Sequence, residues 1–261
     1  MHTNKLRTLL AEGKPSIATR IESTWPLVAE AAAVAGGFDY LEFVAEYAPY
    51  SQTDLENLAR AAELHDTGSM IKLDYQNRFF VAQKALASGF QAVLLTDHHS
   101  AEEVRESIQS IRPATPMDGG RFGCPNRRFI GFQIGIPQMS YAENLRSIVI
   151  AVMIENKDAF SQLDEILNIP GVDMVQFGPS DYALSMGWNA AEHRPELRIV
   201  EAEMIAAALR HGVQPRCEIQ RPEEAAPYRA LGVQHFCIGD ELRNNMLYWK
   251  EVGTSLRAAL D

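Results

Sequence analysis

The feature that most constrains the fold is a pair of strand-like apolar runs, residues 149–154 and 174–177, separated by a helix-length segment. Such runs are typical of parallel strands covered on both faces. Glu155 follows the first run directly, and Asp181 follows the second after a short polar stretch. Ligand sites in parallel sheets lie beyond the carboxyl ends of the strands, so we expect these two carboxylates to share one rim.

Two uses of these carboxylates are compatible with their spacing. Hard divalent cations such as Mg²⁺ or Mn²⁺ prefer oxygen ligands, and two carboxylates with water leave coordination positions for a substrate. Alternatively, Asp181 caps the turn that follows it and Glu155 caps a helix, which is a common use of acidic residues at such places. The residues between strand and acid, Gly178, Pro179 and Ser180, are interpreted as a loop with exposed backbone N–H groups.

Strand-like and helix-like segments alternate along the whole chain. Further strands are expected at residues 16–21, 38–45, 69–73, 91–96, 213–219 and 234–239, each followed by a helical pattern. Eight such units in 261 residues predict a single (β/α)₈ barrel domain, a TIM barrel, over residues 1–261. An open doubly wound sheet is the alternative. It is less favoured because neither Gly-x-Gly-x-x-Gly after the first strand nor a P-loop is present.

Composition excludes several classes of function. The formal net charge of −10 argues against nucleic acid as a partner, because phosphates would be repelled. The first ten residues lack the apolar core of a secretory signal, and no apolar run reaches membrane-spanning length, so we expect a cytoplasmic protein without a membrane partner. Three widely spaced cysteines favour reduced thiols, with Cys217 and Cys237 in the core.

Residues 112–139 interrupt the alternation. Prolines and glycines are frequent there and forbid regular structure over most of the segment. A loop of this length inside a compact domain is usually functional.

Several motifs resemble those of the HpcH/HpaI-type class II aldolases, which act on 2-oxo acids. The likeness covers nearly the whole chain and is carried by the following segments: Gly-Phe-Asp-Tyr at 37–40, Glu46 with Ala-Pro at 48–49, Gly-Phe-Gln-Ala-Val-Leu at 89–94, Ala-Glu-Glu at 101–103, Gly-Arg-Phe-Gly at 120–123, Ile-Glu at 154–155, and Gly-Pro-Ser-Asp-Tyr-Ala-Leu-Ser-Met-Gly at 178–187. The last of these is the most specific.

The resemblance implies a metal-dependent carbon–carbon lyase. It assigns Glu155 and Asp181 as ligands of a divalent metal, Mg²⁺, Mn²⁺ or Co²⁺, and backbone N–H groups of the Gly178 to Asp181 turn as the binding site for the carboxylate of a pyruvate-like substrate. In such enzymes the cation stabilises the pyruvate enolate that forms when the C3–C4 bond of a small 2-oxo acid breaks.

The chain departs from the family pattern at the acid–base positions. The family pattern has an arginine at the end of the third strand, and a histidine base with a supporting aspartate after the second. At these three positions the chain has Lys72, Tyr47 and Val44, respectively. Lysine keeps the charge but lacks the planar fork of arginine, and tyrosine, with an ordinary pKa of about 10, is a poorer base than histidine at about 6.5. Glu46 is retained as a candidate base or as an orienter of Tyr47.

Other polar residues have two interpretations each. His98 and His99 follow the fourth predicted strand and either take over proton transfer or, as we favour, pack in the turn before a helix. Arg20 either pairs with Glu46 or Glu155 or touches substrate.

Arg121 is flanked by glycines in the long loop and matches a family loop near the site. Its guanidinium is a candidate to bind an anionic group of the substrate.

The leading hypothesis is therefore an aldolase-like lyase, Lys72, Tyr47 and Glu46 being its candidate catalytic residues. A decarboxylase or acyl lyase that uses the same enolate chemistry and a non-catalytic 2-oxo-acid-binding protein are the alternatives. The last predicted helix, 241–260, carries an apolar stripe that must be buried. The resemblance implies that this helix is exchanged between protomers of a homo-oligomer, a dimer, trimer or hexamer, although packing on its own barrel would give the same periodicity.

Overall fold

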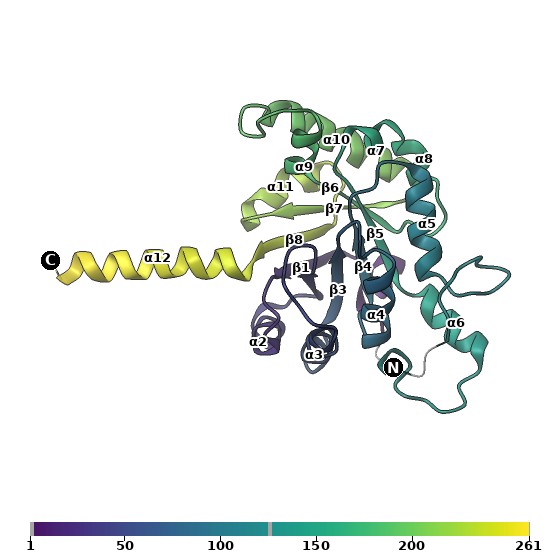
Figure 1. Cartoon of the computed structure of the whole chain (residues 1–261). Helices are drawn as coiled ribbons and strands as arrows, with labels where there is room; N and C mark the ends of the chain where they lie inside the picture. Colours follow the sequence, from purple (N-terminus) through teal and green to yellow (C-terminus); the bar gives the residue numbers. More distant parts are fainter. Residues whose placement is uncertain (1–2, 125–126, 261) are drawn as a thin grey trace.

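Eight parallel strands close into one barrel in chain order, β1 pairing with both β2 and β8 (Figure 1). The computed structural model describes residues 3–124 and 127–260. The strands are β1 Ser16–Ile21, β2 Tyr40–Val44, β3 Gly68–Leu73, β4 Ala92–Leu95, β5 Val149–Ile154, β6 Met174–Phe177, β7 Gln214–Ile219 and β8 His235–Asp240. The predicted (β/α)₈ barrel is thus confirmed, and all eight predicted strands are present.

Helices connect the strands and form the outer layer. They are α1 Lys5–Ala11, α2 Pro26–Gly36, α3 Gln52–Glu63, α4 Phe80–Ser88, α5 Ala101–Ile111, α6 Gln138–Arg146, α7 Lys157–Ser161, α8 Leu163–Leu167, α9 Pro179–Ser185, α10 Arg194–Arg210, α11 Ala225–Ala230 and α12 Glu241–Leu260, with 3₁₀ turns η1 Arg128–Ile130 and η2 Pro222–Glu224. No helix in residues 3–124 and 127–260 is long and apolar enough to cross a membrane.

The core has two parts, as the barrel architecture requires. The larger lies between the strands and the surrounding helices and includes Leu55, Val104 and Ile150. The smaller fills the barrel interior with side chains such as Met70 and Leu94. Cys217 and Cys237 are buried in β7 and β8, as predicted.

Helix α1 packs against the end of the barrel. Leu6 is only 2% exposed and belongs to the interior core of the barrel. Asn4 caps the helix by accepting the N–H of Arg7, and its side-chain amide donates to the carbonyls of Gln91 (2.7 Å) and Ser147 (2.8 Å). Since these carbonyls precede β4 and β5, α1 closes the amino end of the barrel.

The polar stretch after β6 is also helical rather than a loop. Pro179 is the first residue of α9, where its missing N–H costs no hydrogen bond and its fixed φ suits a helix. Asp181 consequently lies in the first turn of that helix. The segment 112–139 is mostly irregular, as predicted, but it contains η1 and the start of α6, and residues 125–126 lie outside the described part.

Helix α12 extends away from the barrel (Figure 1). None of its residues is buried in the single chain. The apolar stripe predicted along it is exposed, at Leu242, Met246, Trp249, Val252 and Leu256.

Candidate active site

The carboxyl end of β5 places Glu155 inside the mouth of the barrel. This residue is 3% exposed. Its Oε1 accepts a 2.6 Å hydrogen bond from the backbone N–H of Asp97, whereas its buried Oε2 has no hydrogen-bond partner among the described residues. Burial raises the pKa of Glu155 to about 7, against the opposing effects of that hydrogen bond and of the Lys72 charge. An unpartnered buried carboxylate oxygen is costly unless a cation or proton occupies it.

Asp97 is a functional residue that the sequence did not reveal. Its φ of 60° is left-handed, a conformation that aspartate tolerates better than most residues. Its side chain holds that conformation by accepting the backbone N–H of Tyr75 (2.9 Å) and the hydroxyl of Thr96 (2.9 Å). In this left-handed conformation the backbone N–H of Asp97 points toward Glu155 and donates a hydrogen bond to it. The only sequence signal was its place directly after the fourth strand.

Gly178 brings β6 against Glu155. A Cβ at this position would lie 2.6 Å from the Cβ of Glu155 and 2.9 Å from the Cε of Met153. Only glycine permits this approach. Asp181 follows three residues later, exposed in the first turn of α9, and its charge contributes to the raised pKa of Tyr47. Glu155, Gly178 and Asp181 thus all follow the carboxyl ends of β5 and β6, at one end of the barrel.

On the opposite side of the mouth, β2 and β3 supply an ion pair between Lys72 and Glu46, both largely buried. Burial disfavours the ammonium, but the carboxylates of Glu46, Glu42 and Glu155 outweigh it, so that the pKa of Lys72 is raised above its ordinary value. Lys72 is therefore a fixed positive charge at neutral pH.

Tyr47 lies at the rim above this pair. Its side chain is 73% exposed, and the Lys72 ammonium lies 5.8 Å from the centre of its ring. Desolvation of the hydroxyl, together with the carboxylates of Glu46 and Asp181, raises its pKa to about 12. A phenol that stays protonated at neutral pH is a poor general base.

The remaining candidates have other partners. Arg20 pairs with Glu218 (2.9 Å) of β7 and Asp240 (3.2 Å) of β8, and not with Glu46 or Glu155. The predicted ion pairs of Arg20 with Glu46 or Glu155 are therefore wrong.

Of His98 and His99, only His98 adopts the packing interpretation that the sequence favoured. The ring of His98 is buried, with its Nε2 3.0 Å from the hydroxyl of Ser107 on α5, and burial places its pKa well below the ordinary value. His99 is exposed and lies 3.2 Å from Asp158.

Arg121 is separated from the other site residues within the chain. Its backbone N–H donates to Gln109 (2.7 Å) near the carboxyl end of α5, which runs back toward the amino end of the barrel. Its predicted role in binding an anionic group stays a prediction without support from its position in this chain.

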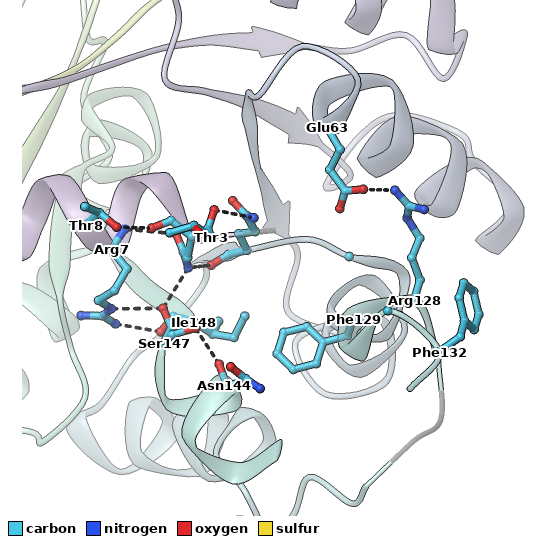
Figure 2. Close-up of a pocket in the computed structure, with 14 residues that line it drawn as sticks. Thr3, Arg7, Thr8, Glu63, Arg128, Phe129, Phe132, Asn144, Ser147 and Ile148 are labelled. Carbon is cyan, nitrogen blue, oxygen red and sulfur yellow. Dashed lines mark hydrogen bonds and ion pairs between the residues drawn. The ribbon is translucent and has the colours of Figure 1, made fainter. Parts of the chain in front are cut away.

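A hollow of about 520 Å³ lies at that amino end (Figure 2). Two arginines of its lining are engaged in ion pairs: Arg7 binds both carboxylate oxygens of Asp173 at 2.6 Å, and Arg128 pairs with Glu63. The chemistry of Glu155, Lys72 and Glu46 is at the other end of the barrel. This hollow is therefore not the candidate active site.

A closed (β/α)₈ barrel with acids and a lysine at the carboxyl ends of its strands defines an enzyme-like class in which loops and strand ends carry the chemistry. A sequence model of the HpcH/HpaI aldolase/citrate lyase family matches residues 21–232, and the chain belongs to this family. The predicted family and aldolase-type carbon–carbon lyase class are thus confirmed.

Relatives of known name support the same class. The chain is 28% identical to a 2-keto-3-deoxy-L-rhamnonate aldolase of Escherichia coli, over 95% of this chain and 94% of that protein. It is 26% identical to a 5-keto-4-deoxy-D-glucarate aldolase of Klebsiella pneumoniae, over 92% and 91%. Its fold is similar to that of an HpcH/HpaI aldolase from Desulfitobacterium hafniense, with a TM-score of 0.87, 22% identity and coverage of 97% and 96%.

Proposed function

We propose that this protein is a divalent-metal-dependent aldolase that cleaves the C3–C4 bond of a small 4-hydroxy-2-oxo acid. The observation that carries the proposal is the buried carboxylate of Glu155. One of its oxygens is fixed by Asp97 and the other has no partner among the described residues, at a mouth that also holds Asp181, Lys72 and Glu46.

Glu155 and Asp181 fit a hard cation because both offer carboxylate oxygens at the same mouth. Residues 3–124 and 127–260 contain no preformed group of three His, Cys, Asp or Glu side chains for a metal. Two protein ligands would leave positions for water and for a chelating substrate. Bound there, Mg²⁺, Mn²⁺ or Co²⁺ would supply positive charge next to the developing enolate.

The first turn of α9 would bind the substrate carboxylate. In a helix the first N–H groups have no partner within the helix, and those of Ser180 and Asp181 lie beside Gly178, which touches Glu155. Pro179 contributes no N–H and instead starts the helix at this point.

Lys72 and Glu46 would act on the reacting atoms. As the C3–C4 bond breaks, its electron pair would form the C2=C3 bond of the enolate and the carbonyl π pair would move to the keto oxygen, whose charge the ammonium of Lys72 would stabilise electrostatically. The proton of the C4 hydroxyl would pass to Glu46, the acid paired with Lys72, so that C4 leaves as the aldehyde, and this proton would then be delivered to C3 of the enolate to give pyruvate. Tyr47, protonated and exposed, would border the exit rather than act as base.

The most direct test is a panel of 4-hydroxy-2-oxo acids assayed for pyruvate release with Mg²⁺, Mn²⁺ or Co²⁺ added back, together with deuterium exchange at C3 of pyruvate. The proposal expects metal-dependent cleavage and exchange, both lost with a chelator. Exchange without cleavage would favour the decarboxylase or acyl lyase alternative. Pyruvate binding with neither reaction would favour the non-catalytic binding protein.

We also propose that α12 packs on another protomer of a homo-oligomer. Its apolar residues include Trp249 and Leu256, both at least 60% exposed in the single chain, and an exposed stripe of this length marks an interaction surface. Light scattering at micromolar concentration should give a dimer, trimer or hexamer, and the Trp249→Glu/Leu256→Glu variant should dissociate. A monomeric parent protein would refute the exchange. The control Arg257→Glu changes charge on the same helix outside the stripe.

A further inference from the structure

A buried polar group crosses the interior of the barrel beneath the mouth. Arg216 of β7 is completely buried, and its guanidinium binds the side chains of Glu42 and Gln176 and the hydroxyl of Tyr40, the last at 2.7 Å. All three partners are at most 2% exposed. We call Arg216, Glu42, Gln176 and Tyr40 the interior network.

The topology shows that this network spans the barrel. Tyr40 and Glu42 belong to β2 and Gln176 belongs to β6, two strands that are not neighbours in the closed sheet. A single side chain that bonds to both must therefore pass through the interior. The interior of the barrel also contains apolar side chains, including Met70, Leu94 and Met174.

Stability alone does not account for such a group. Removing two charges from water costs free energy that their attraction often fails to offset, and replacing a buried ion pair with apolar side chains is frequently neutral or stabilising. The interior network therefore calls for a role other than stabilising the barrel.

Its position suggests that role. Glu42 lies in β2, four residues before Glu46, which follows the end of that strand. Gln176 lies in β6, two residues before Gly178. Glu42 is also one of the carboxylates that raise the pKa of Lys72, whereas Arg216 is not among the main influences on that lysine. The interior network thus links β2, on one side of the mouth, to β6, on the other, through the barrel interior beneath the mouth.

We propose that Arg216 and Glu42 are positioning residues for the lyase reaction: their ion pair, with Gln176, fixes β2 against β6 and so holds Glu46 and Lys72 across the mouth from Gly178 and Glu155. This inference rests on the proposed function for its kinetic consequence. Its structural consequence, the environment of Lys72, is independent of that function.

The test is the double variant Glu42→Leu/Arg216→Met. Both charges are removed together because one left alone in the interior would destabilise the fold. The matched control is Arg128→Met/Glu63→Leu, a largely buried ion pair at the opposite end of the barrel. Circular dichroism and light scattering establish that each variant keeps the fold and assembly of the parent.

Two measurements report on positioning. The kcat for cleavage should fall roughly 10-fold to 10²-fold with smaller changes in KM and metal affinity, because small displacements of reacting groups have effects of this size. The control should retain the parental kcat.

The second measurement is the pKa of Lys72, followed by ¹³C NMR after reductive methylation and assigned with Lys72→Arg. Charged and titratable groups around this lysine are Glu46, Tyr47, Glu42, Glu155 and Glu218. Losing Glu42 and loosening Glu46 should lower its pKa by roughly half a unit or more.

A folded double variant with parental kcat and parental Lys72 titration would overturn the proposal and make the network a purely structural one. If the parent protein cleaves no 2-oxo acid, the proposed function fails, and the Lys72 titration alone decides the inference. If the double variant does not fold, Gln176→Leu replaces it, since it changes no charge and removes only the link to β6. Its kcat should fall severalfold, and a parental value would again overturn the proposal.

Discussion

The two sides of the barrel mouth differ in how far they keep the pattern expected of the family. On the β5 and β6 side, Glu155, Gly178 and Asp181 match that pattern in the sequence, and a hydrogen bond from the Asp97 N–H fixes Glu155. On the β2 and β3 side, the expected histidine and arginine are replaced by Tyr47 and Lys72.

This difference separates two steps of the proposed reaction, enolate stabilisation and proton transfer, by how well each accepts a replaced residue. In the proposed reaction, stabilising the enolate needs positive charge at a fixed place, and the Lys72 ammonium, paired with Glu46 and held in its charged form, would supply it. Proton transfer needs a group with a suitable pKa, and Tyr47 at about 12 does not have one. The four predictions below test this contrast.

The largest effect is expected on the β5 and β6 side. Asp181→Ala should remove most of the bound divalent metal and lower the cleavage rate about 10³-fold, since a metal ligand controls several kcal/mol of charge stabilisation. Elemental analysis and steady-state kinetics measure both. Asp158→Ala, in the first turn of α7, is the matched control and should change neither. Full metal content in Asp181→Ala would disprove the ligand assignment.

On the β2 and β3 side, Lys72→Ala should lower kcat about 10²-fold to 10³-fold, the usual cost of losing one electrostatic contact to the transition state. Metal content should stay at the parental level, because Lys72 is not a ligand. Lys157→Ala serves as an exposed control. If Lys72→Ala cleaves as fast as the parent, the charge on this side is not used in the reaction.

A third, smaller effect concerns stability. The pKa of Glu155 is about 7 in the folded protein and 4.5 ordinarily. Between pH 4.5 and pH 7 the folded chain therefore keeps a proton on Glu155 that the unfolded chain has lost. The free energy of unfolding of the metal-free protein should therefore fall as pH rises from 4.5 to 7, by about 3 kcal/mol at most.

Urea unfolding of Glu155→Gln should lack this decline, and added Mn²⁺ should raise the free energy of unfolding of the parent at pH 8, where the decline is complete. The exposed control Glu165→Gln should keep the parental slope. The same decline in Glu155→Gln as in the parent would show that another group titrates.

The smallest effect is expected for Tyr47→Phe. Since the hydroxyl is protonated at neutral pH and the ring is exposed, the cleavage rate should change no more than about threefold, well below the loss of a general base. The kcat/KM between pH 6 and pH 9 is the measurement. A decrease of tenfold or more would identify Tyr47 as part of the proton-transfer machinery after all.

Much of the fold was predictable from local patterns. Apolar runs such as Val149–Ile154 predict buried parallel strands, and the capped segment Ala101–Ile111 predicts a helix, because both signals depend only on neighbouring residues. Helix α9 was missed because Gly-Pro-Ser also occurs in loops. Pro179 at a helix start is recognised only once the chain direction after β6 is known.

By itself, the sequence determined which strands carry acids at their ends, and hence that Glu155 and Asp181 meet at one rim of a barrel. Only the tertiary structure decided how the polar groups pair, since pairing depends on contacts between residues far apart in the chain. In the structure Arg20 forms ion pairs with Glu218 and Asp240, and Lys72 forms one with Glu46. The backbone N–H of Asp97 donates a hydrogen bond to Glu155. Burial determines these pairings, because a charge or an N–H group that is removed from water needs a protein partner close to it in space.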